Sequence, residues 1–227
     1  MAVSVKRFKR QELVKGSSLD HYLVKVRFFG EERDIREFIQ PRSAPVLDVA
    51  EGLPADKDQA VRETWGYIAR NIIYPPVKPY DYRYQEAFTS QAGAVKVFEP
   101  RVALISETRY DYWQMPAETL AEGLGDCEDM TFVGVSVLRN RLSADEVFAT
   151  IGLWEGYGHA WITVLKNGQA LVFEPTRSPQ WPLRLEAPDY EPFVRFNDVS
   201  FREIRSGLLA GARPRCRVEL SRLKKAG

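Results

Sequence analysis

Cys127, His159 and Glu174 have the types and the order of a nucleophile, a base and an orienting acid. A thiol attacks a carbonyl carbon only as the thiolate. A nearby imidazole must exchange its proton, and a third polar group must fix the tautomer of that imidazole. The alternatives are few, because the chain has two cysteines and two histidines. Cys216 stands in a basic tail with no histidine nearby in sequence, and His21 stands at the beginning of an expected strand. These types therefore favour acyl transfer through Cys127.

A helix is expected to begin at Cys127. Asp126 is a good N-cap residue, and acidic residues fill the first turn, as helix N-termini prefer. The apolar positions that follow indicate a buried face; they are Met130, Val133, Val137 and Leu138. Unpaired N–H groups and the helix dipole stabilise a thiolate at this end. Residues 116–122 predict a short preceding helix with proline in its first turn.

Asn167-Gly168 is the strongest hairpin signal in the chain, and it joins expected strands at 160–165 and 170–173. A two-residue turn there places His159 and Glu174 on one sheet face, within reach of an imidazole–carboxylate hydrogen bond. The opposite face is then apolar, as a core face should be. A one-residue bulge would reverse this parity. The alternative for Glu174 is that it faces solvent or caps a turn.

These motifs resemble the transglutaminase-like cysteine enzymes of the papain-like superfamily, and look most like the bacterial transglutaminase-like cysteine proteinases. The resemblance covers residues 56–178 and rests on four segments: Tyr112–Leu120, Gly125–Asp129, Gly158–Ile162 and Phe173–Thr176. It implies a catalytic triad of Cys127, His159 and Glu174. Glu174 departs from the family, which usually has aspartate there, and one extra methylene can be absorbed by a small backbone shift.

The resemblance also bears on the residues around the triad. It implies no required cofactor, although some bacterial relatives bind calcium near the acidic motif, here Asp126, Glu128 and Asp129; carboxylates in a turn are suitable calcium ligands. The alternative is N-capping of the helix by Asp126 and Asp129.

An oxyanion needs preorganised N–H donors. The Cys127 amide is one, and Trp113 or Gln114 is the second by resemblance. Trp113 has packing as an equal alternative, and Trp161 is expected to floor the site or to pack.

The expected fold is α+β, with the cysteine helix packed on an antiparallel sheet. Residues 1–55 are expected to form an N-terminal strand and extension packed on the core. Residues 56–200 are expected to form the catalytic core, with a helix at 56–74 and a Tyr/Pro-rich insertion at about 74–110. Residues 201–227 are expected to form a basic extension, with a short helix near 201–209. The prolines between residues 41 and 54 indicate a loop.

Charge is distributed unevenly along a chain whose net charge is +1. Residues 1–15 carry +4 and residues 202–227 carry +6, so the body between them is acidic. Solvated tails are the first interpretation of such ends, with an acidic partner or nucleic acid as the alternative. With no apolar run of membrane-spanning length and no signal peptide pattern, a cytoplasmic location is expected.

The sequence thus predicts a cysteine peptidase, amidase or transglutaminase acting on protein or peptide amides through a thioester. The alternative is an interaction or assembly subunit that retains the fold without activity. Phosphate-binding, dinucleotide-binding and serine-esterase motifs are absent from the sequence, which leaves those classes without support.

Overall fold

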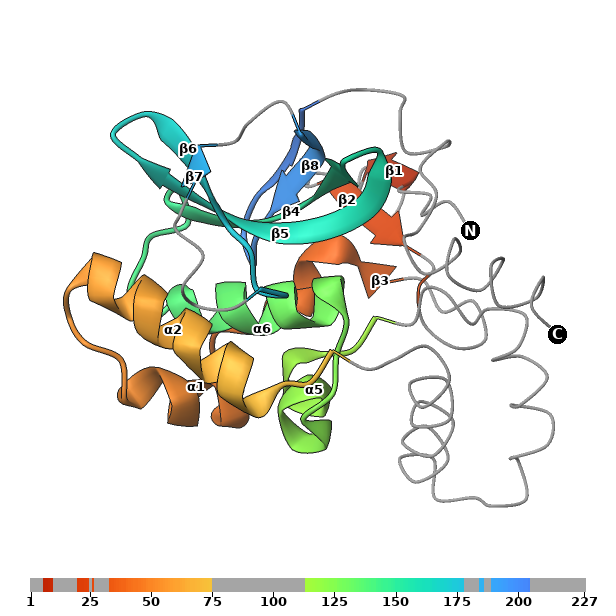
Figure 1. The fold of residues 1–227 in the computed structure, drawn as a ribbon. Helices are drawn as coiled ribbons and strands as arrows, with labels where there is room; N and C mark the ends of the chain where they lie inside the picture. Colours follow the sequence, from red (N-terminus) through yellow and green to blue (C-terminus); the bar gives the residue numbers. More distant parts are fainter. Residues whose placement is uncertain are drawn as a thin grey trace, which may run out of the picture.

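The computed structural model describes residues 6–9, 20–24, 26, 33–74, 113–177, 184–185 and 189–204. Helices form one layer and the larger sheet the other (Figure 1). The helices are η3 (Ile35–Phe38, 3-10), α1 (Ala44–Glu51), α2 (Lys57–Asn71), α5 (Pro116–Glu122) and α6 (Cys127–Leu138). The strands are β1 (Lys6–Lys9), β2 (Asp20–Val24), β3 (Arg33–Asp34), β4 (Val147–Trp154), β5 (Tyr157–Lys166), β6 (Gln169–Phe173), β7 (Arg184–Leu185), β8 (Tyr190–Phe196) and β9 (Phe201–Glu203).

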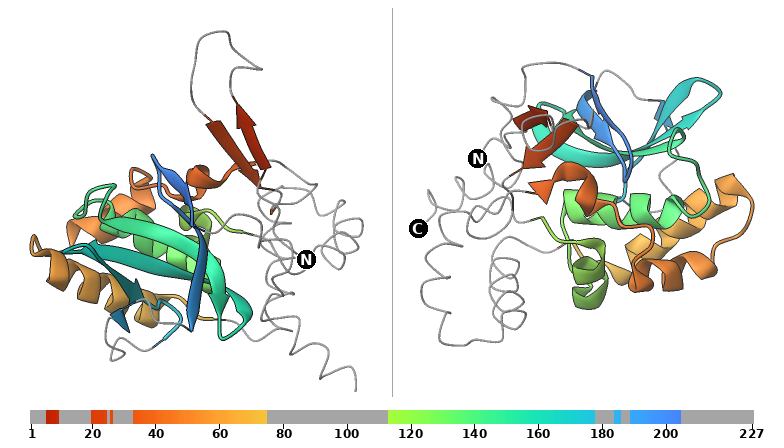
Figure 2. Two further views of the ribbon diagram at one scale, coloured as in Figure 1. Left: turned by 90° about the horizontal axis from the view of Figure 1, so that it is seen from above. Right: turned by 180° about the vertical axis from the view of Figure 1, so that it is seen from behind.

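The larger sheet is antiparallel throughout. Within the described ranges its strand order is β7-β6-β5-β4-β8-β9, and a second sheet has the order β1-β2-β3. Figure 2 shows the small sheet beside the end of the two-layered body. The chain is therefore an α+β protein with an antiparallel sheet, as the sequence predicts.

Helix α6 lies between the sheet and the other helices, and every residue after Cys127 in it is buried. Gly134 permits this close approach, because a Cβ at that position would lie 2.4 Å from Ile162 Cδ1 of β5 and 3.0 Å from Ile68 Cδ1 of α2. The helix that begins at Cys127 is thus fixed from both sides.

Two local expectations are wrong. The segment expected as a proline-rich loop contains α1, in which Pro45 occupies the first turn, where its missing N–H has no helical partner to lose. A helix is expected near 201–209, but residues 201–203 pair with β8 as β9; residues 205–209 lie outside the described part. A short segment that follows a strand can readily pair with that strand, and the hydrophobic pattern of three residues is too short to predict this pairing.

Parts of the expected organisation lie outside the described residues. Beyond Tyr74 the Tyr/Pro-rich stretch is among them, as are residues 205–227 and most of residues 1–15. In the described ranges, no helix combines the length and the hydropathy that crossing a bilayer requires.

Candidate active site

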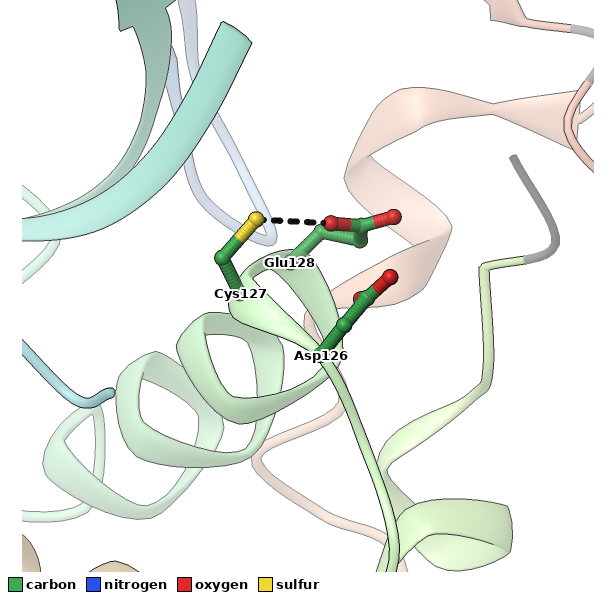
Figure 3. A group of neighbouring side chains, drawn as sticks. All are labelled: Asp126, Cys127 and Glu128. Carbon is green, nitrogen blue, oxygen red and sulfur yellow. Dashed lines mark hydrogen bonds between the residues drawn. The ribbon is translucent and has the colours of Figure 1, made fainter. Parts of the chain in front are cut away.

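Cys127 is the first residue of α6, as the capping pattern predicts. Figure 3 shows its side chain at the head of the helix, beside the carboxylates of Asp126 and Glu128. Its Sγ donates to Glu128 Oε2 across 3.0 Å. The thiol thus has a helix N-terminus, which favours negative charge, and an adjacent carboxylate, which opposes it.

Asp129 braces the turn before the helix. It is fully buried, and its Oδ1 accepts from Gln114 N (2.8 Å) while its Oδ2 accepts from Asp126 N (3.3 Å). A Cβ at Gly125 would stand 2.8 Å from Asp129 Cβ, so the chain passes close to this carboxylate. For Asp129, backbone capping is what the structure shows.

The hairpin has the predicted register. Ile162 pairs with Phe173 and Lys166 with Gln169, without a bulge between β5 and β6. Asn167 and Gly168 have φ of 52° and 76°, the left-handed conformation that a type I′ turn requires. This parity brings His159 Nε2 to 2.8 Å from Glu174 Oε2. Both side chains are buried, at 3% and 1% exposure.

The Glu174 carboxylate is held at both oxygens. Oε1 accepts from Thr176 N (3.1 Å) and Thr176 Oγ1 (2.6 Å), and Oε2 accepts from Tyr190 OH (3.3 Å) as well as from the imidazole. Glu174 therefore both hydrogen-bonds to His159 and caps the turn that follows. Its carboxylate does not face solvent, which was the other alternative. Burial by itself would raise the pKa of Glu174, but the charge of His159 and the hydrogen bonds from His159 and Thr176 outweigh it and hold that pKa below 4.5.

Aromatic rings surround the imidazole. The ring centroid of His159 lies 5.3 Å from that of Trp154 and 6.3 Å from that of Trp161, and Trp161 meets Tyr190 edge to face at 5.1 Å. Arg177 lies over Trp154 at 4.8 Å. Trp161 is fully buried, so it packs rather than reacts. The rings exclude water from the imidazole–carboxylate hydrogen bond, which is stronger in such surroundings.

Cys127 is the first residue of α6, and His159 is the third residue of β5. β5 packs against α6, and it begins over the end at which α6 begins (Figure 1). Their hydrogen bonds do not join them: among the described contacts, Cys127 Sγ is bonded to Glu128 and His159 Nε2 to Glu174. His159 lies on the sheet face opposite Ile162, the residue that packs against the middle of α6.

Trp113 and Gln114, which precede Cys127 in the chain, both make contacts within the fold. The Trp113 ring packs against Phe38 and Phe132, at centroid distances of 5.3 and 5.2 Å. This is the packing alternative for Trp113. Gln114 donates its backbone N–H to Asp129 and its Nε2 to Leu124 O (3.3 Å). Because the Nε2 amide carries two hydrogens, Gln114 could serve as an oxyanion donor without giving up either bond.

Three neighbouring side chains lie close enough together to contact one metal ion. The ligand atoms of Asp126, Cys127 and Glu128 lie within 4.8 Å of one another. Calcium takes six to eight oxygen ligands, and this group offers two carboxylates and a thiol. Asp129, the remaining predicted ligand, already binds two backbone N–H groups. The described donor set is therefore smaller than the set that calcium prefers.

Sequence reasoning did not assign Thr176, Tyr190 or Trp154 to the site. Thr176 had a signal, since it stands two residues after Glu174 in a turn, where an acidic side chain can accept from the backbone N–H two residues on. Tyr190 had none. It comes from β8, which pairs with the far side of β4, and no local pattern reveals such a contact.

No protein-family model matches the chain, and no curated protein is significantly similar in sequence. Among solved structures it is similar to Legionella pneumophila LapG in two states. The calcium-bound form is 17% identical, with a TM-score of 0.39 over 82% of this chain and 99% of LapG. The EGTA-treated form is 18% identical, with a TM-score of 0.40 over 74% and 87%. A likeness of this extent carries no argument about activity or metal.

Proposed function

We propose that this chain is a cysteine-dependent acyl-transfer enzyme of the transglutaminase-like type, acting on protein or peptide amides. The observation that carries the proposal is the buried hydrogen bond between His159 Nε2 and Glu174 Oε2. A buried imidazole fixed by a carboxylate is the arrangement that activates a nucleophile. Cys127, at the head of α6, is the thiol that this imidazole would serve.

The two ring nitrogens of His159 have different roles in this mechanism. Nε2 donates to Glu174, so Nδ1 is the nitrogen that takes the proton from Cys127 Sγ. For this the thiol must turn away from Glu128. The thiolate then attacks the amide carbonyl, and the Cys127 backbone N–H helps to hold the developing oxyanion. The imidazolium returns its proton to the leaving amine, which departs and leaves a thioester on Cys127.

The second half of the reaction transfers the acyl group. Water attacks the thioester carbonyl, His159 Nδ1 removes its proton, and the Cys127 thiol is regenerated with release of a carboxylic acid. An amine in place of water would give a new amide. Water is the default acceptor, because its exclusion requires a closed tunnel. No step passes through a metal.

Alkylation with iodoacetamide and mass mapping of the modified residue tests the nucleophile. Cys127 is expected to react about tenfold or more faster than in a His159→Gln variant. His21→Gln is the matched control. Equal total labelling of wild type and Cys127→Ser would overturn the assignment. Repeating the wild-type measurement in EGTA and in added calcium tests whether calcium affects the thiol.

A second candidate, an interaction or assembly subunit without activity, is favoured by two observations. The thiol is bonded to a carboxylate instead of the imidazole, and His159 lies on the sheet face opposite the one that packs on α6. In that case Cys127 would react at the same slow rate with and without His159, and the protein would still associate with a partner. Size-exclusion chromatography and pull-down, with and without the basic ends, would detect such association.

A further inference from the structure

We infer that Thr176 and Tyr190 are positioning residues that hold the Glu174 carboxylate, and through it the His159 imidazole, in one orientation. The inference rests on the proposed function for its catalytic meaning. Neither residue contacts the reacting atoms, and both act through Glu174.

The geometry of the carboxylate supports this assignment. Two ionised oxygens offer about four lone-pair sites, and the four hydrogen bonds described above place two donors on each oxygen. Three of the four come from Thr176 and Tyr190. With Glu174 only 1% exposed, water does not supply these bonds. Removing one donor would leave a buried charged acceptor less satisfied, which is costly.

Glutamate needs this restraint. Its side chain has one more rotatable bond than the aspartate that the resemblance leads us to expect, so more conformational freedom must be lost to keep one oxygen on Nε2. The Thr176 donors fix Oε1, which sets the plane of the carboxylate. Tyr190 fixes Oε2 from β8, a strand outside the hairpin that carries His159 and Glu174.

Two hydroxyl-deleting variants and two comparisons separate positioning from general destabilisation. Thr176→Val and Tyr190→Phe each remove one donor. Thr176→Ser keeps the hydroxyl. Thr163→Val is the matched control, because it deletes the buried 2.6 Å hydrogen bond between Thr163 and Thr150 on the same sheet without touching Glu174.

The first measurement follows His159 and does not depend on the thiol. In a His21→Asn background, the remaining imidazole signals in ¹⁵N-resolved NMR belong to His159. Exchange of the Nε2 proton with water is expected to be about tenfold faster or more in Thr176→Val, and faster to a lesser degree in Tyr190→Phe. Thr176→Ser should restore most of the protection, and Thr163→Val should resemble wild type.

The second measurement is the iodoacetamide rate at Cys127, expected to fall about tenfold in Thr176→Val and to recover in Thr176→Ser. Unchanged proton exchange in both deletion variants, equal exchange in Thr163→Val and Thr176→Val, or an unchanged Cys127 rate in Thr176→Val would overturn the inference. If instead the wild-type rate equals that of His159→Gln, the proposed function fails, and the NMR comparison alone decides whether the clamp exists.

Discussion

The Cys127 thiol stands between two opposing influences. The first turn of α6 favours a thiolate there. Glu128 opposes it, because its carboxylate accepts a hydrogen bond from the neutral thiol and would repel the negative charge of a thiolate. At the partly buried head of a helix, a neighbouring charge acts through a lower effective dielectric than bulk water provides. Proton transfer from the thiol therefore requires that its hydrogen bond to Glu128 be broken first.

Glu128→Gln should accelerate alkylation of Cys127 at neutral pH by about tenfold, because the substitution removes the negative charge beside the sulfur. The rate is measured with iodoacetamide under pseudo-first-order conditions. Glu63→Gln, an exposed glutamate on α2, is the control and should leave the rate unchanged. Equal rates in both variants would show that Glu128 does not restrain the thiol.

The candidate site could be predicted where its geometry is local. The pairing of His159 with Glu174 followed from one two-residue turn and the alternation of side chains along two strands. The hydrogen bond from Tyr190 could not be predicted, because it depends on β8 pairing with the far side of β4. The hydrogen bond from the Cys127 thiol to Glu128 could not be predicted either. A contact between adjacent side chains depends on their rotamers, which the sequence pattern does not specify.

At the scale of elements, glycine positions control how closely α6 and the sheet approach. A Cβ at Gly134 would meet the side-chain ends of Ile162 and Ile68 on opposite sides of the helix. Gly66 of α2 differs, because its Cβ would meet only the flexible guanidinium of Arg70, at 2.9 Å. The same substitution in two helices therefore has opposite consequences.

Gly134→Ala should lower the free energy of unfolding by about 1–3 kcal/mol, since overpacking costs more than the gain in helix propensity. Gly66→Ala should raise it by up to about 1 kcal/mol, because Arg70 can move aside. Urea unfolding at constant pH measures both. A stabilised Gly134→Ala protein would show that α6 and β5 are less tightly packed than the structure has them.

Element prediction succeeded where start and stop signals agreed with periodicity. Helices α5 and α6 begin at the expected residues for this reason. α1 was missed because prolines 41, 45 and 54 suggested a loop, although proline is compatible with a first helical turn. The strand expected to begin near His21 is β2, which runs from Asp20 to Val24; residues 27–30 lie outside the described part.

Across the whole molecule, two carboxylates of opposite exposure link stability to pH. Hydrogen bonds from Lys57 and Ser143 lower the pKa of Glu146 to about 2, and it lies at a surface contact between α2 and the start of β4. Glu174 is the buried counterpart. Both groups have folded-state pKa values below their ordinary value, so each stabilises the fold above about pH 4.5, and this contribution is lost as the pH falls through the folded-state pKa.

The two contributions should separate by salt and by substitution. Added NaCl should weaken the Glu146 contribution, because its partner Lys57 is 56% exposed, and leave that of the buried Glu174 largely intact. Glu146→Gln and Glu174→Gln should each flatten the fall in stability between pH 6 and 3, measured by urea unfolding. An unaltered pH profile in Glu174→Gln would contradict the lowered pKa of Glu174.

The fold class could be predicted from the whole sequence, since helical periodicities followed by strand patterns with short turns favour α+β. The relative position of Cys127 and His159 could not be predicted in the same way. They stand on separate elements, α6 and β5, and where each side chain lies depends on how α6 packs on β5.

The turn between α5 and α6 holds two distant parts of the chain. Leu124 pairs with Ile73, just after α2, and its carbonyl accepts from Gln114. Residues 74 and 113 therefore belong to chain ends that are held together a few residues before Cys127. The entropy of closing a loop grows only with the logarithm of its length. The chain between them could be lengthened, shortened or exchanged at small thermodynamic cost while the two-layered scaffold stays the same.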